Sequence, residues 1–450
     1  MCGIVLQFGE FDSAALQRAA QGIAHRGLPN RNGMVVEDNF ALIHVRLPIV
    51  GLDTKFDQPY YITEEGWVAW VGEIHNYKNL MPKAQCDTEY VATLGDATKQ
   101  DGFWASVHHR AGGHTIIRVD YLAQKPLYWR QDVNVICSEI PPLLEWGHMD
   151  FDRHYLSNVQ KWGYDPMGGT PYKGVIRLGP GTEIIFDEHE HVVVFRKYYP
   201  DFKSFSHSAP SLNELVRTAV ENRLVSDVPV ALLLSGGLDS AIIAACLPEG
   251  HKVKAFTIEN GETDAAKRVA ERFGLELEVL SAAPTELDKL AAARAYWEPI
   301  DLGSVVPQYM LGKAIAAQGY HVVLSGDGAD ELFGGYERSL TYDSQFSDVF
   351  CELPFYHLPR LDTLMMRHTI ELRCPFLAPY IVEHALSVPH KPYRMNKQML
   401  RDAFATELEE LTDVSKKPLR AIDPYDLTLR AQRVQDFTHE RGAYENSTRN

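Results

Sequence analysis

The sequence predicts two domains of different fold class, an α+β domain followed by an α/β domain built on a doubly wound parallel sheet. In the first half, short apolar or β-branched segments are separated by turn residues, which is typical of strands. In the second half, similar segments alternate with stretches of helical periodicity, which favours strand–helix–strand units. The length of 450 residues fits two or three domains of roughly 150 residues each.

Strands in the first half are expected at short runs that turn residues bound on both sides. They are residues 2–8, 40–45, 67–71, 114–119, 133–137 and 192–195. A polar, serine-rich stretch without periodicity, DFKSFSHSAPS, follows at residues 201–211. We therefore place the domain boundary at about residue 205, which gives domains of residues 1–205 and 206–450.

The second half begins with helical periodicity at residues 212–224. Strand and helix patterns then follow at residues 229–234, 240–247, 252–258, 262–273, 277–280 and 321–324. Because strands alternate with helices, we expect parallel strands joined by right-handed crossovers. Ligands of such sheets bind beyond the carboxyl ends of the strands, so the loops there are candidates for a site.

The charge balance excludes some classes of function. With 44 basic and 60 acidic side chains the formal net charge is −16, and 45% of the residues are hydrophobic and 23% charged. This is the composition of a globular protein rather than of a disordered chain. Binding to the phosphate backbone of nucleic acids needs a basic face, so we expect no nucleic-acid partner.

No pattern indicates export or membrane insertion. The first residues, MCGIVLQFGE, hold no basic segment ahead of an apolar one. The longest apolar runs, such as residues 230–234, fall far below the roughly 20 residues needed to cross a bilayer. The cysteines are scattered without a CxxC pair, at Cys2, Cys86, Cys137, Cys246, Cys351 and Cys374. This predicts neither disulfides nor a zinc site, and favours a reducing cytoplasm.

The most specific motif is SGGLDS at residues 235–240, between an expected strand and an expected helix. Its glycines let the backbone approach a ligand, and the first turn of the helix offers unpaired N–H groups to an anion. Asp239 fits beside phosphates if Mg²⁺ lies between them. The spacing differs from the GxxxxGK[ST] phosphate loop, and the lysine is absent. A plain glycine-rich turn is the structural alternative.

A second glycine-rich segment, SGDGADELFGGY at residues 325–336, also follows an expected strand. Four glycines and three carboxylates, among them Asp327 and Asp330, suit a site for Mg²⁺ and a nucleotide. Taken alone, the segment could be an acidic surface turn. Beside the SGGLDS loop, the functional interpretation is favoured.

Cys2 follows the initiator Met1 directly. If Met1 is removed, Cys2 carries both a thiol and a free α-amine, and an amine with a pKa near 8 can act as the base for the adjacent nucleophile. Most lone cysteines are instead small apolar residues of the core, and Cys2 by itself favours that interpretation.

Further segments reverse this preference. Residues 25–27 (HRG), 46–50 (RLPIV) and 72–76 (GEIHN), with Cys2 and Asp87, resemble the class II glutamine amidotransferases. The SGGLDS loop resembles the pyrophosphate loop of ATP-pyrophosphatase-type ligases. Together they resemble the glutamine-hydrolysing asparagine synthetase family over nearly the whole chain, including residues 120–128, 137–139, 371–377 and 416–417.

This resemblance implies an N-terminal αββα sandwich of the N-terminal-nucleophile (Ntn) hydrolase type and a C-terminal doubly wound parallel sheet of the ATP-pyrophosphatase type. It implies that the Cys2 thiolate attacks glutamine and that the Gly72 N–H donates to the oxyanion. Arg46 would hold the α-carboxylate, and Glu73 and Asp87 the α-ammonium. The implied glutamine-binding residues are Arg46, Leu47, Pro48, Ile49, Val50, Gly72, Glu73 and Asp87.

The chain departs from the family pattern at Val71, where the family has an asparagine that is the second oxyanion donor. Loss of one such donor typically lowers the rate by about 10²–10³. The family's HRGPD segment is also altered, to HRGLPN at residues 25–30. An ammonia-dependent enzyme with an impaired glutaminase site is therefore an alternative.

In the second domain the resemblance implies ATP and Mg²⁺ as cofactors. The implied pyrophosphate and adenosine contacts are Leu234, Ser235, Gly236, Gly237, Asp239, Ser240, Ile258, Ser325 and Gly326. Asp239 and Asp330 would hold Mg²⁺, and Lys417 would neutralise charge on the reacting phosphates. Asp327 would lie near the acyl adenylate and orient the attacking amine or accept its proton.

The implied reaction is ATP-dependent amidation of aspartate to asparagine through β-aspartyl-AMP, with ammonia from glutamine and with AMP, pyrophosphate and glutamate as the other products. The implied partners are these small molecules, without nucleic acid or membrane; a homodimer is compatible with the resemblance, although the sequence does not determine the oligomeric state. Two other functions stay open: a ligase that amidates a different carboxylate, and a non-catalytic protein that senses glutamine or nucleotide.

Overall fold

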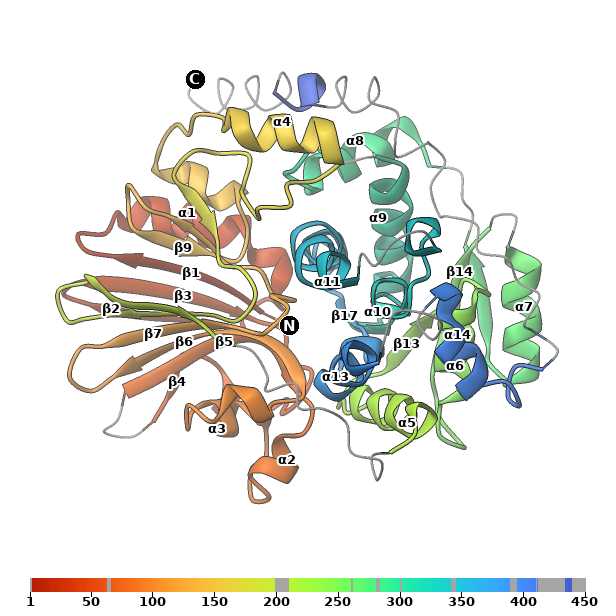
Figure 1. Ribbon diagram of the computed structural model, residues 1–450. Coiled ribbons are helices and arrows are strands. Elements are labelled where there is room, and N and C mark those ends of the chain that lie inside the picture. The colour runs from red at the N-terminus through yellow and green to blue at the C-terminus, as the bar shows by residue number, and fades with distance from the viewer. Residues whose placement is uncertain are drawn as a thin grey trace.

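The computed structural model describes residues 2–62, 66–198, 210–259, 262–280, 284–299, 302–340, 345–388, 395–409, 411 and 434–438. It contains two antiparallel sheets in the first half of the chain and a parallel sheet in the second half (Figure 1). The predicted domain boundary at about residue 205 lies outside the described residues.

The first antiparallel sheet has β1 near its centre, between β9 and β3. Its strands in spatial order are β10 (Val175–Arg177), β8 (Tyr128–Arg130), β9 (Val135–Cys137), β1 (Cys2–Phe8), β3 (Phe40–Arg46) and β2 (Asn32–Glu37). All residues of β1 are buried, because one face packs on the second sheet and the other on helix α1 (Ser13–Gly22). Burial on both faces explains why residues 2–8 form a continuous apolar run rather than an alternating one.

The second antiparallel sheet stacks on the first (Figure 1). Its strands in spatial order are β12 (Val192–Lys197), β11 (Thr182–Phe186), β7 (Thr115–Val119), β6 (Gly102–Arg110), β5 (Gly66–Ile74) and β4 (Tyr60–Tyr61). Ile4 and Leu6 of β1 share an apolar cluster with Ala69 and Val71 of β5. The outer face of β5 packs against α2 (Tyr77–Leu80) and α3 (Asp87–Val91), so the domain has the predicted αββα layers.

The C-terminal sheet consists of parallel strands in the order β15 (Leu277–Leu280), β14 (Lys254–Ile258), β13 (Val230–Leu233), β16 (Val322–Leu324) and β17 (Glu371–Arg373). The order reverses at β13, whose neighbours are β14 and β16. The loops after β13 and β16 therefore lie side by side at the switch point of the sheet, where doubly wound folds bind ligands. This topology confirms the predicted fold class.

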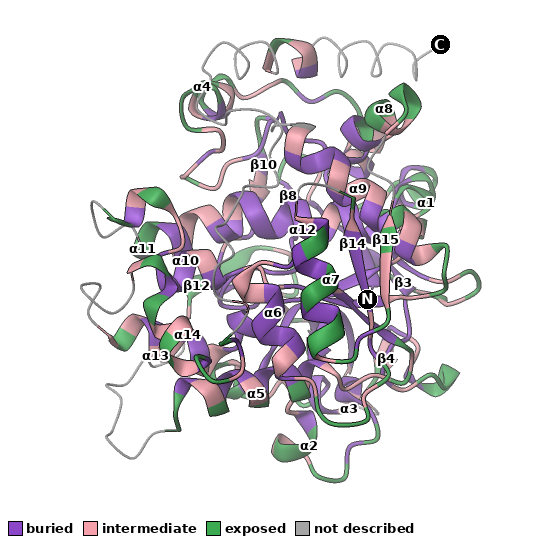
Figure 2. Cartoon of the chain, turned by 90° about the vertical axis from the view of Figure 1, so that its right-hand side faces the viewer, coloured by how far each residue is buried: buried purple, intermediate pink, exposed green. Residues whose placement is uncertain are grey.

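Helices cover both faces of the parallel sheet. Figure 1 shows α7 (Thr263–Arg272) on one side of β14 and α9 (Leu302–Ala316) on the other, and Figure 2 shows α7 with an exposed outer face above the buried strand. The other helices of this domain are α5 (Leu212–Arg223), α6 (Leu238–Ala245), α8 (Glu286–Ala295), α10 (Ala329–Phe333), α11 (Gln345–Ser347), α12 (Leu358–Met366), α13 (Pro379–Ser387) and α14 (Gln398–Ala403), with a π-helix at Asp348–His357. Helix α4 (Arg153–Trp162) belongs to the first half of the chain.

The predicted strands agree with the observed ones to within a few residues at each end. None of the strands β2, β4, β6, β8, β10, β11 and β17 was expected from the sequence. Of these, β4, β8, β10 and β17 have only two or three residues each, and β6 is long but mixed in polarity. Within the part of the chain that is described, no helix combines the length and apolar character needed to span a membrane.

Buried ion pairs join the two halves of the chain. The guanidinium of Arg26 donates to Glu139 at 2.9 Å and to Asp362 of α12 at 2.8 Å, and its Nε donates to the carbonyl of Cys2 at 3.0 Å. The Nζ of Lys125 lies 2.8 Å from the other oxygen of Asp362. Because Arg26 is fully buried, its charge depends on these carboxylates for compensation.

Replacement of Arg26 tests the strength of this junction. We expect R26M to lower the free energy of unfolding by about 3 kcal/mol, the low end for a broken buried ion pair, because Asp362 keeps Lys125 and Glu139 keeps His25. R18M is the control, since the Arg18–Glu145 pair is exposed and should contribute less than about 1 kcal/mol. Urea denaturation measures both, and equal effects of the two substitutions would contradict the assignment.

Candidate functional site

The first candidate site lies where β1 begins and β3 ends. Cys2 is paired in register with Arg46, so the antiparallel pairing alone brings these residues together from distant parts of the sequence. Cys2 is buried, and its Sγ accepts a hydrogen bond from the backbone N–H of Leu47. Burial raises the pKa of the thiol, although Arg46 acts in the opposite direction. Cys2 therefore needs a base before it can act as a nucleophile.

The guanidinium of Arg46 is held by hydrogen bonds to residues between β3 and β4. Its Nη1 donates to Asp57 Oδ1 at 2.8 Å and to the carbonyl of Asp53 at 3.2 Å, and its Nη2 donates to the carbonyls of Gly51 at 2.6 Å and Val50 at 3.3 Å. Asp57 also pairs with Arg31, at 2.6 Å. No motif in the sequence marks Asp57, which fixes the position of this guanidinium. A carboxylate ligand at Arg46 would have to exchange with one of these contacts.

The other predicted glutamine contacts lie around this loop. Leu47, Ile49 and Val50 are buried, as is Pro48. Gly72 of β5 has φ of +122°, and a Cβ there would lie 2.0 Å from the carbonyl oxygen of Phe103, so only glycine fits. Val71 packs in the apolar cluster that includes Cys2, and its side chain offers no hydrogen-bond donor.

Glu73 and Asp87 are buried and share a hydrogen bond. Burial raises the pKa of Glu73 well above its usual value, and Asp87 raises it further. Burial also raises the pKa of Asp87, although hydrogen bonds such as the one from the Ile74 N–H at 3.2 Å oppose this. Two such groups in contact hold a proton that a bound cation would displace.

The second domain contributes to this same pocket through strand β17. Glu371 interacts electrostatically with Cys2, Glu73 and Asp87. Arg373 donates from Nε to Glu371 Oε1 at 2.6 Å, and its Nη2 lies 3.9 Å from Glu73 Oε1. Residues 371–377 belong to the family resemblance, but no pattern in the sequence predicts their place beside Glu73.

The second candidate site is formed by the loops after β13 and β16. Gly237 is the N-cap of α6 and Gly236 has φ of +82°. The Oγ atoms of Ser235 and Ser240 lie 3.1 Å apart, and Ser235 Oγ accepts from the N–H of Gly237 at 3.2 Å. A Cβ on Gly326 would lie 2.8 Å from that of Asp239, so the two loops are in direct contact.

The remaining predicted residues of this site lie nearby or outside the described residues. Leu234 follows β13, with its N–H donating to Phe256 at 2.8 Å, and Ile258 ends β14. The N–H of Ser325 donates to the Arg373 carbonyl at 2.9 Å, and its Oγ donates to Asp327. The predicted Lys417 lies outside the described residues.

Lys397 lies between the two carboxylates predicted to hold Mg²⁺. Its Nζ is 2.7 Å from Asp239 Oδ1, 2.5 Å from Asp239 Oδ2 and 2.7 Å from Asp330 Oδ1. Burial would lower the pKa of Lys397, but the two carboxylates outweigh it and raise the pKa. No motif marks Lys397; the only signal for it was the surplus of acidic residues in the two loops, which requires a nearby cation.

The two carboxylates fit a bound Mg²⁺. An ammonium already occupies the position between Asp239 and Asp330 as a stand-in cation. Magnesium in nucleotide sites is typically held by one or two carboxylates together with phosphates and water. Among the described residues, no group of three or more His, Cys, Asp or Glu side chains that could hold a metal ion occurs.

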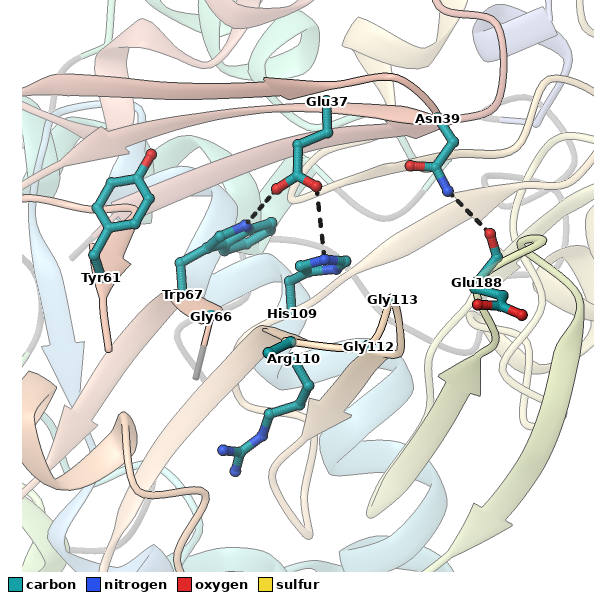
Figure 3. A pocket seen from close by; sticks show the side chains of 11 residues that line it. Glu37, Asn39, Tyr61, Gly66, Trp67, His109, Arg110, Gly112, Gly113 and Glu188 are labelled. Atoms are coloured by element: carbon teal, nitrogen blue, oxygen red, sulfur yellow. Dashed lines mark hydrogen bonds and ion pairs between the residues drawn. The ribbon is translucent and has the colours of Figure 1, made fainter. Parts of the chain in front are cut away.

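A surface hollow of about 460 Å³ lies apart from both candidate sites (Figure 3). Glu37 accepts from Trp67 Nε1 at 3.4 Å and lies 3.8 Å from His109 Nε2. The hollow is lined by Glu37, Asn39, Tyr61, Gly66, Trp67, His109, Arg110, Ala111, Gly112, Gly113 and Glu188. Since no predicted site residue is among them, we do not assign this hollow to the reaction.

Substitution of Gly236 tests the phosphate-binding loop. A Cβ at this position would meet the backbone N of Ala266 at 2.4 Å, so G236A should separate the loop from α7 and weaken ATP binding at least about tenfold. G250A is the control, because Gly250 also has positive φ, of +76°, but has open space around it. Calorimetric titration with ATP measures both variants. Equal ATP affinity in the two would contradict a role for this loop in binding.

Comparison with known proteins agrees with this arrangement. The asparagine synthase model matches residues 211–350 and 343–449, and the glutamine amidotransferase domain model matches residues 1–199. A putative asparagine synthetase [glutamine-hydrolyzing] 2 of Methanocaldococcus jannaschii is 29% identical over 397 residues, which are 76% of this chain and 76% of the relative.

Two other relatives align over more of the chain. A probable asparagine synthetase [glutamine-hydrolyzing] of Dictyostelium discoideum is 28% identical over 90% of this chain and 81% of its own. Asparagine synthetase B [glutamine-hydrolyzing] of Escherichia coli is 26% identical over 91% of this chain and 80% of its own. The chain therefore belongs to the asparagine synthase family, as a glutamine-dependent ligase with an N-terminal glutamine amidotransferase domain.

Proposed function

We propose that this chain amidates L-aspartate to L-asparagine, using ATP for activation and glutamine as the source of ammonia. The observation that carries the proposal is that one chain contains both sites. In one, a buried Cys2 lies beside Arg46; in the other, two contiguous loops lie at the switch point of the parallel sheet. The relatives named as glutamine-hydrolyzing asparagine synthetases support the choice of reaction.

In the amidotransferase domain, after removal of Met1, the α-amine of Cys2 takes the thiol proton and the thiolate attacks the glutamine carboxamide. The same amine returns the proton to the nitrogen that leaves as ammonia. Water then hydrolyses the thioester to glutamate. The α-ammonium of glutamine is placed at Glu73 and Asp87, whose buried carboxylates lack a full complement of cations. The α-carboxylate is placed at Arg46, which exchanges a carbonyl contact for it. The Gly72 N–H stabilises the oxyanion without the help of a side chain at Val71.

In the synthase domain, the β-carboxylate of aspartate attacks the α-phosphorus of ATP and pyrophosphate leaves, giving β-aspartyl-AMP. The loop of residues 235–240 receives the pyrophosphate, because its backbone N–H groups and serine hydroxyls line the start of α6. Asp239 and Asp330 would hold Mg²⁺, which would supply positive charge beside the phosphates. The family resemblance assigns a further cation to Lys417, which lies outside the described residues.

Ammonia then attacks the acyl carbon and AMP leaves, giving asparagine. Asp327 accepts the proton that ammonia loses. Its carboxylate is an acceptor for the Ser325 hydroxyl, which keeps it oriented at the end of β16. The short strand β17 pairs with β16 and also reaches Glu73 of the other pocket through Arg373. Ammonia must travel between the two sites shielded from water, because protonation would abolish its nucleophilicity.

A second candidate is an enzyme that uses free ammonia and has lost effective glutaminase activity. The observation that favours it is the apolar packing of Val71, which leaves the oxyanion with one donor fewer. A ligase for another carboxylate is a further alternative, and an amidase chyE of Penicillium rubens is 27% identical over 72% of this chain.

Removal of the Cys2 thiol separates the two half-reactions. C2A should abolish asparagine formation from glutamine while asparagine and pyrophosphate still form from ammonium salt at about the wild-type rate. C137A is the matched control, because Cys137 is also buried but lies in β9 away from Arg46, and it should retain both activities. If the wild type forms asparagine from ammonia but not from glutamine, the second candidate is correct instead. If pyrophosphate is released only with an acid other than aspartate, the acceptor is a different carboxylate.

Glutamine binding should release protons. The pKa of Glu73 is raised in the free protein. The protonated form of Glu73, which stabilises the free protein, is therefore lost as the pH rises through that pKa. The α-ammonium favours the ionised pair and lowers this pKa. Binding should therefore strengthen with rising pH until glutamine's own amine deprotonates. Calorimetry of glutamine with C2A in buffers of different ionisation enthalpy measures the release, and E73Q should abolish it. Heats that do not depend on the buffer would contradict the ammonium assignment.

A further inference from the structure

We propose that Lys397 is a tethered counter-cation that occupies the Mg²⁺ position between Asp239 and Asp330 and must leave it when Mg²⁺ arrives with ATP. This inference rests on the proposed metal role of these two carboxylates. It adds that the protein without nucleotide excludes the free metal, so that metal and ATP enter together.

The contacts of Lys397 support this assignment. Its Nζ contacts both oxygens of Asp239 and one oxygen of Asp330 at 2.5–2.7 Å, so one ammonium bridges two carboxylates from the first turns of α6 and α10, which follow β13 and β16. The Lys397 side chain is 6% exposed, against 18% for Asp239 and 16% for Asp330. The carboxylates thus reach solvent more than the lysine does, and a ligand can approach them while the lysine lies beneath.

The backbone around Lys397 is shaped to hold its side chain there. Asn396 and Lys397 have φ of +52° and +55°, two consecutive residues in the left-handed region that side chains disfavour. The N–H of Asn396 donates to the carbonyl of Gly334 at 2.9 Å. A Cβ on Gly335 would lie 2.3 Å from Lys397 Cε and 1.9 Å from Asp330 Oδ1, so the glycine leaves the space that the Lys397–Asp330 pair fills.

Electrostatics explain why an exchange would be coupled to ATP. A free Mg²⁺ must give up water and displace a cation that is already attached to the chain, which opposes binding by two carboxylates alone. Phosphates that arrive with the metal supply further oxygen ligands and negative charge, so they compensate both the metal and the displaced ammonium. Lys397 thus holds the two segments together without nucleotide and delays metal binding until the nucleotide is present.

The test is binding of Mn²⁺ alone to the full chain, measured from the electron paramagnetic resonance signal of the free ion without nucleotide. K397M should bind one Mn²⁺ at least about tenfold more tightly than the wild type. K397Q, which removes the charge but keeps a polar side chain, should do the same. K254M is the matched control: Lys254 also bridges two carboxylates, Glu276 at 3.0 Å and Glu278 at 2.9 Å, but at the start of β14, opposite the loops. Its affinity for Mn²⁺ should equal that of the wild type.

Further variants separate this inference from the proposed function. D330N in the K397M background should remove the gain in affinity, and D330N alone should weaken binding of Mn²⁺ together with ATP. If D330N weakens binding with ATP but neither K397M nor K397Q gains affinity without it, the counter-cation role is wrong while the metal role stands. If D330N has no effect with ATP, the metal role fails, and the inference fails with it.

Discussion

Both candidate sites depend on the hydrogen bonds and ion pair made by the guanidinium of Arg373. It is fully buried, it donates to Glu371, and through Nη1 it donates to the carbonyls of Arg223 and Val225 at 2.7 Å each. Its own carbonyl accepts from the Ser325 N–H. One residue of a three-residue strand thus joins the end of α5, the loop that holds Asp327 and the carboxylate pocket of the other domain. A buried charge with this many partners allows little displacement, so the two sites are fixed relative to each other.

Both sites contain more negative charge than positive charge, and each compensates for it differently. In the amidotransferase pocket, Glu73 and Asp87 share a hydrogen bond and have raised pKa values, which favours retention of a proton as the compensation. In the synthase domain, Lys397 supplies it to Asp239 and Asp330. On the proposed roles of these groups, binding of substrate or metal would be an exchange of cations.

The oxyanion position illustrates how a single side chain can change a site without changing the fold. Val71 packs in the apolar cluster between the two sheets, and Gly72 has a φ of +122° that only glycine adopts readily. The fold thus accommodates valine at this position, whereas the proposed oxyanion site would have one side-chain donor fewer. For this reason the ratio of glutamine-dependent to ammonia-dependent activity is the property of this chain that its architecture constrains least.

The sequence by itself determined the order and class of the domains, the strand ahead of each glycine-rich loop, and the identity of residues whose chemistry is local, such as Cys2, Gly236 and Asp239. These depend on periodicity and on backbone conformation, which act over a few neighbouring residues. Tertiary structure alone decided that Lys397 meets Asp239, 158 residues away, and that β17 reaches Glu73. These contacts compensate buried charge, and the partner of a buried charge is set by packing between elements rather than by any pattern along the chain.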